Sequence, residues 1–217
     1  MTENAAPEAL LEALDEYNID LPEDQTGALA RYCQVLWQWN EKLNLTRHTD
    51  YDRFVSRDLI DSLQLERQIQ SGDRVLDVGT GGGVPGVILA ILRPDLQVSL
   101  CDSVAKRARA VADIVEQLNL DITVLHAAAQ AVLAEYQFET LVARAVAPLP
   151  KLLTWLAPHW AAFSQLLIVQ GPRWIEQRGQ ARHVGLLTDL ELRKVAEYTT
   201  PGNDHPSVIL RIRPEGD

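Results

Sequence analysis

Apolar residues recur every three or four positions through the N-terminal third of the chain, which is the period of a helix that buries one face. The three clearest series predict helices over residues 8–17, 26–43 and 51–70. No run typical of a strand precedes residue 73. We therefore predict that residues 1–70 form a helical extension.

After residue 70 the apolar pattern changes to short runs separated by helical stretches. These runs predict strands over residues 74–79, 97–102, 122–126, 138–145 and 165–170. The alternation is typical of βαβ units, whose parallel strands are buried and read as near-continuous apolar runs. Two later runs, 190–198 and 207–213, flank a Pro-Gly turn and predict an antiparallel pair. Residues 71–217 are thus expected to form an α/β domain with a mostly parallel sheet.

Composition narrows the class of protein. The chain has 217 residues, of which 47% are hydrophobic and 23% charged, so it can bury a sizeable core. It contains no apolar run near the ~20 residues that a membrane span needs, and its start lacks the pattern of a signal peptide. Two cysteines and five scattered histidines provide no metal-binding spacing, so no metal site is expected. We expect a cytoplasmic protein with no membrane partner, acting as a monomer.

The net charge of −10 argues at first against a nucleic-acid partner, because such proteins are usually basic. However, the charge is unevenly distributed. Residues 1–30 hold eight acids and no Lys or Arg, and the remaining 187 residues carry a net charge of only −2. Residues 141–183 hold five basic side chains against one acid. Because phosphate attraction depends on the local field, the acidic total is compatible with RNA binding through one face.

A glycine-rich segment joins the first predicted strand to the next helix. Residues 77–86 read D-V-G-T-G-G-G-V-P-G. Glycine permits positive φ and lets the backbone approach a ligand closely. Asp102 ends the following strand, 23 residues after Gly79. In a doubly wound sheet, a carboxylate at that place lies beside the ribose of a bound nucleoside.

Two ligands compete for this segment. Gly81, Gly83 and Gly86 satisfy the dinucleotide pattern GxGxxG, and Asp102 has the offset typical of NAD binding. The same segment also satisfies the D/E-x-G-x-G-x-G pattern of S-adenosylmethionine enzymes, starting at Asp77. We favour S-adenosylmethionine, because a carboxylate suits its cationic methionyl end and would repel a pyrophosphate. A purely structural glycine turn is the alternative.

Further segments resemble one family, the bacterial small-subunit ribosomal RNA guanine-N7 methyltransferases, also called the glucose-inhibited division protein B family. The matching segments are W-N-E-K-L-N-L-T at 39–46, R-D-L-I-D-S at 57–62, the glycine segment at 77–86, R-P at 93–94, D-S-V-A-K-R at 102–107, A-R-A at 143–145 and Gly171. Their order and spacing agree throughout, from about residue 32 to 175.

The resemblance implies a class I methyltransferase fold, in which a Rossmann-like, mostly parallel sheet ends in an antiparallel pair and follows a helical extension. It implies S-adenosylmethionine as methyl donor and small-subunit ribosomal RNA, or the ribosomal subunit, as partner. With the glycine pattern, it gives the expected cofactor-binding residues: Asp77, Gly79, Gly81, Gly83, Val84, Asp102, Ala129, Gln130 and Arg144.

The sequence departs from the family pattern at four positions. Asp58 stands where the family usually has His, Ala128 and Gln130 stand where it has a basic-acidic pair, and Gln170 replaces a Lys. Three of these changes remove a charge that could hold RNA or cofactor. A module that binds S-adenosylmethionine but has lost catalysis is therefore one alternative.

Methylation of guanine N7 would require little protein chemistry. N7 has a lone pair and no proton, so we expect no general base, and catalysis would consist mainly of positioning. Arg144 is the residue expected to position the guanine, by holding a phosphate or O6 rather than clamping N7 and O6 together. The alternative for Arg144 is a surface salt bridge with a neighbouring acid.

The expected RNA-binding residues are Lys106, Arg107, Arg173 and Trp174. The two basic residues at 106 and 107 begin a helix. The alternative to RNA contact is that they lie on a solvated face of this helix. Trp174 is the tryptophan best placed to stack on a base.

Two other enzyme classes remain open from the residues alone. A methyltransferase acting on a protein or small molecule is one, although the N-terminal helices and the W-N-x3-N-L-T segment speak against it. An NAD-dependent oxidoreductase is the more distant one.

Overall fold

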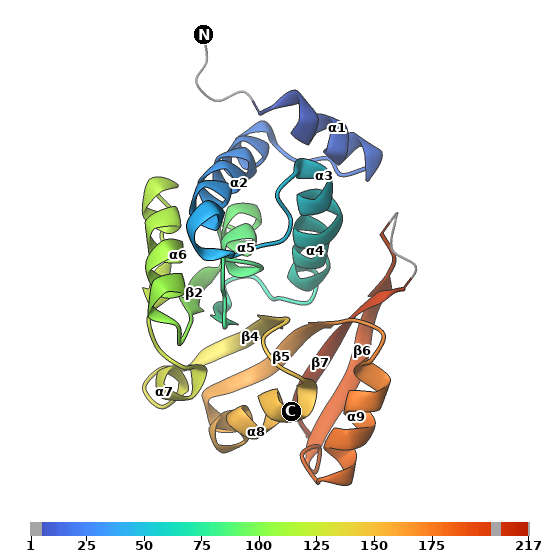
Figure 1. The fold of residues 1–217 in the computed structure, drawn as a ribbon. Helices are drawn as coiled ribbons and strands as arrows, with labels where there is room; N and C mark the ends of the chain where they lie inside the picture. The colour runs from blue at the N-terminus through green and yellow to red at the C-terminus, as the bar shows by residue number, and fades with distance from the viewer. Residues whose placement is uncertain (1–5, 201–204, 217) are drawn as a thin grey trace.

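The computed structural model describes residues 6–200 and 205–216 (Figure 1). The N-terminal third is helical, as predicted, with α1 (Glu8–Glu16), α2 (Glu23–Leu43), α3 (Tyr51–Arg53), π-helix η1 (Phe54–Leu59) and α4 (Ile60–Glu66). The third predicted helix is thus three consecutive pieces. In the described ranges, no helix is long and apolar enough to cross a membrane.

The sheet has seven strands in the order β3-β2-β1-β4-β5-β7-β6. They are β1 (Arg74–Val78), β2 (Gln97–Cys101), β3 (Thr123–Leu125), β4 (Phe138–Arg144), β5 (Phe163–Gln170), β6 (Leu190–Tyr198) and β7 (Ser207–Pro214). Strands β1 to β5 are parallel, whereas β7 runs antiparallel to both β5 and β6. The predicted α/β class and antiparallel pair are confirmed; the Pro-Gly turn between β6 and β7 lies outside the described residues.

Six further helices follow the strands. They are α5 (Gly86–Leu92), α6 (Ala105–Gln117), α7 (Ala129–Leu133), α8 (Leu149–Leu156), the 3-10 helix η2 (Ala157–Ala162) and α9 (Trp174–His183). One buried apolar cluster joins α5 and α6 to the N-terminal helices, and another lies under α7 and α8. The sheet is therefore covered on both faces, which explains why the central parts of its parallel strands are mostly apolar.

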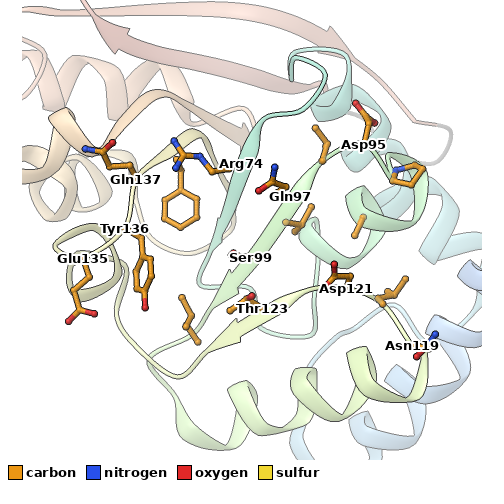
Figure 2. A pocket seen from close by; sticks show the side chains of 17 residues that line it. Arg74, Asp95, Gln97, Ser99, Asn119, Asp121, Thr123, Glu135, Tyr136 and Gln137 are labelled. Carbon is orange, nitrogen blue, oxygen red and sulfur yellow. The ribbon is translucent and has the colours of Figure 1, made fainter.

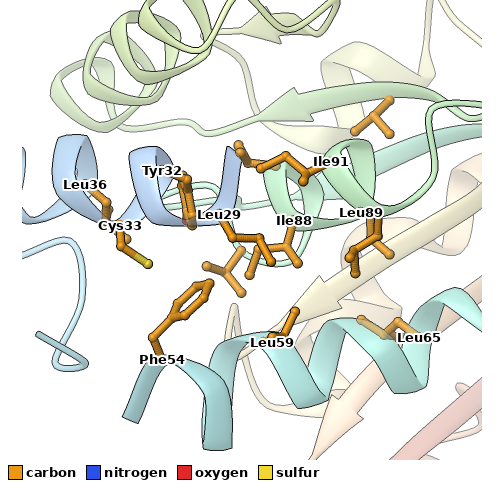
Figure 3. Close-up of a cluster of buried hydrophobic side chains, with 14 of the residues drawn as sticks. Leu29, Tyr32, Cys33, Leu36, Phe54, Leu59, Leu65, Ile88, Leu89 and Ile91 are labelled. Atoms are coloured by element: carbon orange, nitrogen blue, oxygen red, sulfur yellow. The ribbon is translucent and has the colours of Figure 1, made fainter. Parts of the chain in front are cut away.

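The N-terminal helices share the first apolar cluster with the sheet domain. Figure 3 shows Leu29 of α2 lying beside Ile88 of α5, and Tyr32 and Leu36, further along α2, belong to the same cluster. The Tyr32 hydroxyl donates a hydrogen bond to the Gly82 carbonyl at 3.0 Å. The apolar pattern of the sequence changes from helical to strand-like near residue 70. In the structure, however, the helices before that residue pack against the sheet domain and contact the glycine segment.

The sheet topology predicts where a ligand binds. From β1, the chain moves outward through β2 to β3, then returns to β4 on the other side of β1 and continues to β5. This reversal places the topological switch point between β1 and β4. Ligands of open α/β sheets bind at the carboxyl ends of the strands at such a point.

Candidate functional site

A cavity of about 840 Å³ opens at the carboxyl ends of β1, β4 and β5. Its walls come from the glycine segment, from residues 144–148 after β4 and from residues 169–171 at the end of β5. The N-terminal helices and the loop after α2 close one side through Leu36, Leu45, Thr46 and His48. The volume falls in the range of small-molecule sites, ~300–1,000 Å³.

The glycine segment has a backbone that only glycine adopts readily. Gly81 has φ +59°, and its N–H is bound by the Asp102 carboxylate at 3.1 Å. Gly83 has φ +106°, and a Cβ there would lie 2.6 Å from Cγ2 of Val87. The segment therefore packs tightly on α5 while it exposes Gly79, Gly81 and Val84 to the cavity.

Asp77 lies beneath this segment and is fully buried. Its Oδ2 accepts hydrogen bonds from the Thr80 hydroxyl at 2.6 Å and from the Gly86 N–H at 3.0 Å. Its Oδ1 has no hydrogen-bond partner among the described residues. Burial raises the pKa of Asp77 to about 6, although the bonds from Thr80 and Gly86 oppose that rise. The carboxyl group thus holds the shape of the loop and does not line the cavity; its predicted contact with a cofactor stays a prediction.

The raised pKa of Asp77 predicts a pH-dependent stability. Between the unfolded pKa near 4 and the folded value of about 6, the folded chain binds more protons, so stability falls as the pH rises through this window. In Asp77→Asn that fall disappears, because the amide does not titrate. We expect the variant to gain stability relative to wild type between pH 4.5 and 7.5, measured by urea unfolding.

A matched control for this prediction is Asp121→Asn, which changes an exposed carboxylate. Its stability relative to wild type should not vary with pH over the same range. If the wild-type and Asp77→Asn curves run parallel from pH 4.5 to 7.5, the burial of an ionising Asp77 carboxyl is contradicted.

Asp102 ends up close to the glycine segment, as its spacing predicts. Its side chain is 3% exposed, and its two oxygens accept hydrogen bonds from the backbone N–H groups of Gly81 and Val104, at 3.1 and 2.8 Å. Each carboxylate oxygen has a second lone pair. Asp102 therefore ties β2 to the loop, and its bond to a ribose remains a prediction.

Arg144 leaves the end of β4 and enters a network of buried charges. Its Nη2 lies 2.7 Å from Asp58 Oδ1, and its Nη1 lies 3.2 Å from Asp61 Oδ2. The same Nη1 donates to the Arg57 carbonyl at 3.3 Å. His48 Nδ1 lies 2.8 Å from the same Asp58 oxygen, and the Tyr198 hydroxyl donates to Asp61.

This network changes the expected role of Arg144. Two carboxylates already neutralise its guanidinium, and its side chain is only 19% exposed. The structure therefore favours the salt-bridge alternative over the contact with a phosphate or O6, and the pair is buried rather than on the surface. Burial raises the pKa of Asp61, although the positive charge of Arg144 partly offsets this rise.

The network also accounts for Asp58, one of the departures from the family pattern. Its side chain is fully buried and is held by both Arg144 and His48. An imidazole is thus present beside residue 58, from His48, ten positions earlier in the chain. Asp58 therefore belongs to a charged and hydrogen-bonded cluster at the cavity wall.

The remaining predicted residues separate into two groups. Arg107 and Arg173 line the cavity, whereas Lys106, Ala129, Gln130 and Trp174 do not. Trp174 packs against the second apolar cluster, and the Arg178 guanidinium lies 5.0 Å from its ring centroid. The geometry thus favours packing over base stacking for Trp174.

The side chains of the cavity that sequence reasoning missed include Arg57 and His48. Arg57 begins the R-D-L-I-D-S segment, so its sequence signal was available. His48 carried none, because its role depends on a contact with Asp58 that only the fold brings about.

A second cavity, of about 850 Å³, lies at the opposite edge of the sheet. Figure 2 shows it near Arg74 and Gln97, which begin β1 and β2, with Tyr136 at its side. It therefore lies at the amino ends of the parallel strands, away from the glycine segment. In residues 6–200 and 205–216, no group of three or more His, Cys, Asp or Glu side chains could hold a metal ion.

Comparisons with known proteins agree on one family. Residues 25–202 match the family described as rRNA small subunit methyltransferase G. The chain is 49% identical over 186 residues to the ribosomal RNA small subunit methyltransferase G of Rhodopirellula baltica, which covers 86% of this chain and 80% of that protein. It is 39% identical over 147 residues to the same enzyme of Cronobacter sakazakii, covering 67% and 70%.

Solved structures agree on the fold. M. capricolum TrmK in complex with S-adenosyl-homocysteine is similar with a TM-score of 0.56 at 14% identity, over 71% of this chain and 68% of that one. The 23S rRNA methyltransferase ErmE is similar with a TM-score of 0.54 at 17% identity, over 74% and 70%. The Rossmann-like methyltransferase fold that the resemblance implied is thereby confirmed.

Proposed function

This chain belongs to the family of rRNA small subunit methyltransferase G, and we propose that it transfers a methyl group from S-adenosylmethionine to N7 of a guanine in 16S ribosomal RNA. The observation that carries the proposal is the cavity at the switch point, with a glycine segment on one wall and arginines around it. Membership of the family supports the methyltransferase activity and the RNA substrate. The choice of guanine N7 as the methylated atom goes beyond what membership supports and is the specific part of the proposal.

The residues of the cavity fit S-adenosylmethionine. The backbone at Gly79, Gly81 and Val84 faces the cavity without bulky side chains from the glycines, and Asp102 is fixed behind it. The proposed cofactor-binding set is Asp77, Gly79, Gly81, Gly83, Val84, Asp102, Ala129, Gln130 and Arg144, with Asp77 and Arg144 acting through the loop and the ion-pair network. The bound cofactor would supply a methyl group activated on a sulfonium.

The hydrogen bonds of the cavity wall agree with N7 as the target atom. A group with an N–H or O–H must lose a proton when it is methylated, whereas N7 of guanine has none to lose. The titratable groups of the cavity wall, His48 and Asp61, are bound to Asp58, Arg144 and Tyr198. The chain's contribution would therefore be to hold the guanine in line with the methyl group, which is a proximity effect.

The RNA contacts are proposed at Lys106, Arg107 and Arg173, whereas the contact of Trp174, whose ring packs against the second apolar cluster, stays a prediction from the sequence. Arg107 and Arg173 are supported by their place in the cavity wall. Lys106 is exposed beside Arg107 at the start of α6 and could reach a more distant phosphate.

A transfer assay tests the proposed function. Purified protein is incubated with S-adenosylmethionine labelled on its methyl group and with small ribosomal subunits from cells that lack this gene. We expect label in the 16S RNA, and none above background in large subunits or in bulk cell protein. Small subunits from wild-type cells, whose site is already methylated, should take up far less label. Label in protein instead of RNA, or none in either, would contradict the proposal.

A further inference from the structure

The arginines that reach the cavity differ in whether a carboxylate neutralises them. Arg144 is held by Asp58 and Asp61. Arg57, Arg107 and Arg173 also line the cavity, and none of them lies within 4.0 Å of a carboxylate oxygen in the described part of the chain. Of four arginines at one site, three thus have a positive charge that is free for an external anion.

These three arginines come from distant parts of the chain. Arg57 lies in η1, Arg107 in the first turn of α6, and Arg173 directly before α9. Arg107 and Arg173 are exposed, and Arg57 is half-buried. The backbone at Arg57 is anchored, because its carbonyl accepts a hydrogen bond from Arg144. The arrangement therefore presents three solvated cations around one opening.

The number of unpaired arginines indicates which anion they bind, the carboxylate of S-adenosylmethionine or the phosphates of RNA. S-adenosylmethionine has a single carboxylate and no phosphate, so it can engage at most one or two of these arginines. RNA has a phosphate at every nucleotide, and arginine contacts to the backbone fix the position of a nucleic acid without reading its sequence. A reaction that depends on aligning one atom with a methyl group needs such positional contacts.

Building on the proposed function, we propose that Arg57, Arg107 and Arg173 together clamp the RNA backbone phosphates beside the target guanine, and that Arg144 takes no part in this contact. The clamp assigns Arg57 as an RNA-positioning residue. Arg144 instead fixes the backbone that carries Arg57.

The test replaces each of the three arginines with glutamine, singly and together. We expect each single change to raise KM for small subunits about tenfold, the usual effect of losing a hydrogen bond to a charged group. Each should also lower the slope of log affinity against log salt by about 0.7–0.9, and the triple variant by about 2–3. The Kd for S-adenosylmethionine, measured by calorimetry, should change less than twofold.

Arg67→Gln is the matched control. Arg67 is exposed, makes no ion pair among the described residues, and follows α4 at the amino-end edge of the sheet, where the adjacent Gln68 carbonyl is bound by Gln165 of β5. The substitution Arg67→Gln removes one positive charge outside the cavity, as the other substitutions do inside it. The KM for small subunits and the slope of log affinity against log salt should therefore stay at wild-type values.

Two results would overturn the clamp. One is an unchanged KM and salt slope in the triple variant. The other is a Kd for S-adenosylmethionine that rises in parallel with KM, since the anion would then be the cofactor carboxylate. If the wild-type protein transfers no methyl group, the proposed function fails separately. In that case, filter binding of purified 16S RNA to the same variants tests the clamp without methyl transfer. An unchanged salt slope in the triple variant would again overturn it.

Discussion

Replacing Arg144 with methionine is expected to lower the free energy of unfolding by about 3–5 kcal/mol and to abolish methyl transfer. Asp58 is fully buried and Asp61 is 14% exposed, and both would lose the cation that neutralises them. Removing one member of a buried ion pair leaves an uncompensated charge, which has a cost of this size. The side chain of methionine has a similar length, so lost charge rather than lost volume dominates.

The pH dependence of the stability of Arg144→Met distinguishes the effect of the lost charge from that of altered packing. Burial already raises the pKa of the Asp61 carboxyl, and without Arg144, which lowers it, that pKa rises further in the folded variant. The folded variant then binds more protons than the unfolded chain, so its stability increases as the pH falls. Urea unfolding at pH 5.5 and 8 should therefore show a smaller loss at pH 5.5. A loss that is equal at both pH values would contradict the charge network.

Arg74→Met is the control for the size of this effect. Arg74 pairs with Glu139 at 2.6 Å, but both side chains are more than one-third exposed. Exposed pairs contribute about 0–1 kcal/mol. If Arg144→Met destabilises the protein no more than Arg74→Met does, then Arg144 is not the buried charge centre of the site.

Replacing Gly86 with alanine is expected to have the second largest effect. A Cβ at Gly86 would lie 2.2 Å from Cδ2 of Leu100 and 2.9 Å from Cβ and Oδ2 of Asp77. Overpacking of a core usually costs about 1–3 kcal/mol. Here it would also displace the Asp77 carboxyl that holds the glycine segment, so we expect the Kd for S-adenosylmethionine to rise at least tenfold. Chemical unfolding and calorimetry measure the two effects.

The matched control is Gly179→Ala in α9. A Cβ at Gly179 meets no heavy atom within 4 Å, and alanine favours a helix over glycine by about 1 kcal/mol. This variant should be slightly more stable than wild type, with unchanged cofactor affinity. Equal behaviour of the two glycine variants would contradict tight packing beneath the glycine segment.

The fold and the glycine segment could be predicted because their signals are local. The helical period ends and the strand runs begin near residue 71, and the loop pattern at 77–86 follows a strand directly. Asp102 was expected at the end of the second strand and follows β2 directly, and the parallel pairing of β1 with β2 brings it beside the loop. The π-helix was not predictable, because its six residues continue the same apolar pattern as an α-helix.

The site was harder to predict where roles depend on contacts between distant residues. Arg144 and Asp58 are 86 positions apart, and nothing in either segment shows that they form an ion pair. Asp77 matched a cofactor pattern, yet its Oδ2 accepts both of its hydrogen bonds from within its own segment, from Thr80 and Gly86. Local patterns therefore predicted the loop and the strand ends around the cavity, whereas the pairing of distant side chains could be read only from the fold.

The most direct test is to identify the methylated atom. Small subunits from cells lacking this gene are treated with the purified protein and S-adenosylmethionine, and nucleosides from the 16S RNA are then analysed by mass spectrometry. The account predicts that 7-methylguanosine appears at one guanine, and that Arg144→Met does not produce it. A methyl group on another atom of the RNA, or no gain of 7-methylguanosine with the wild-type protein, would contradict the account.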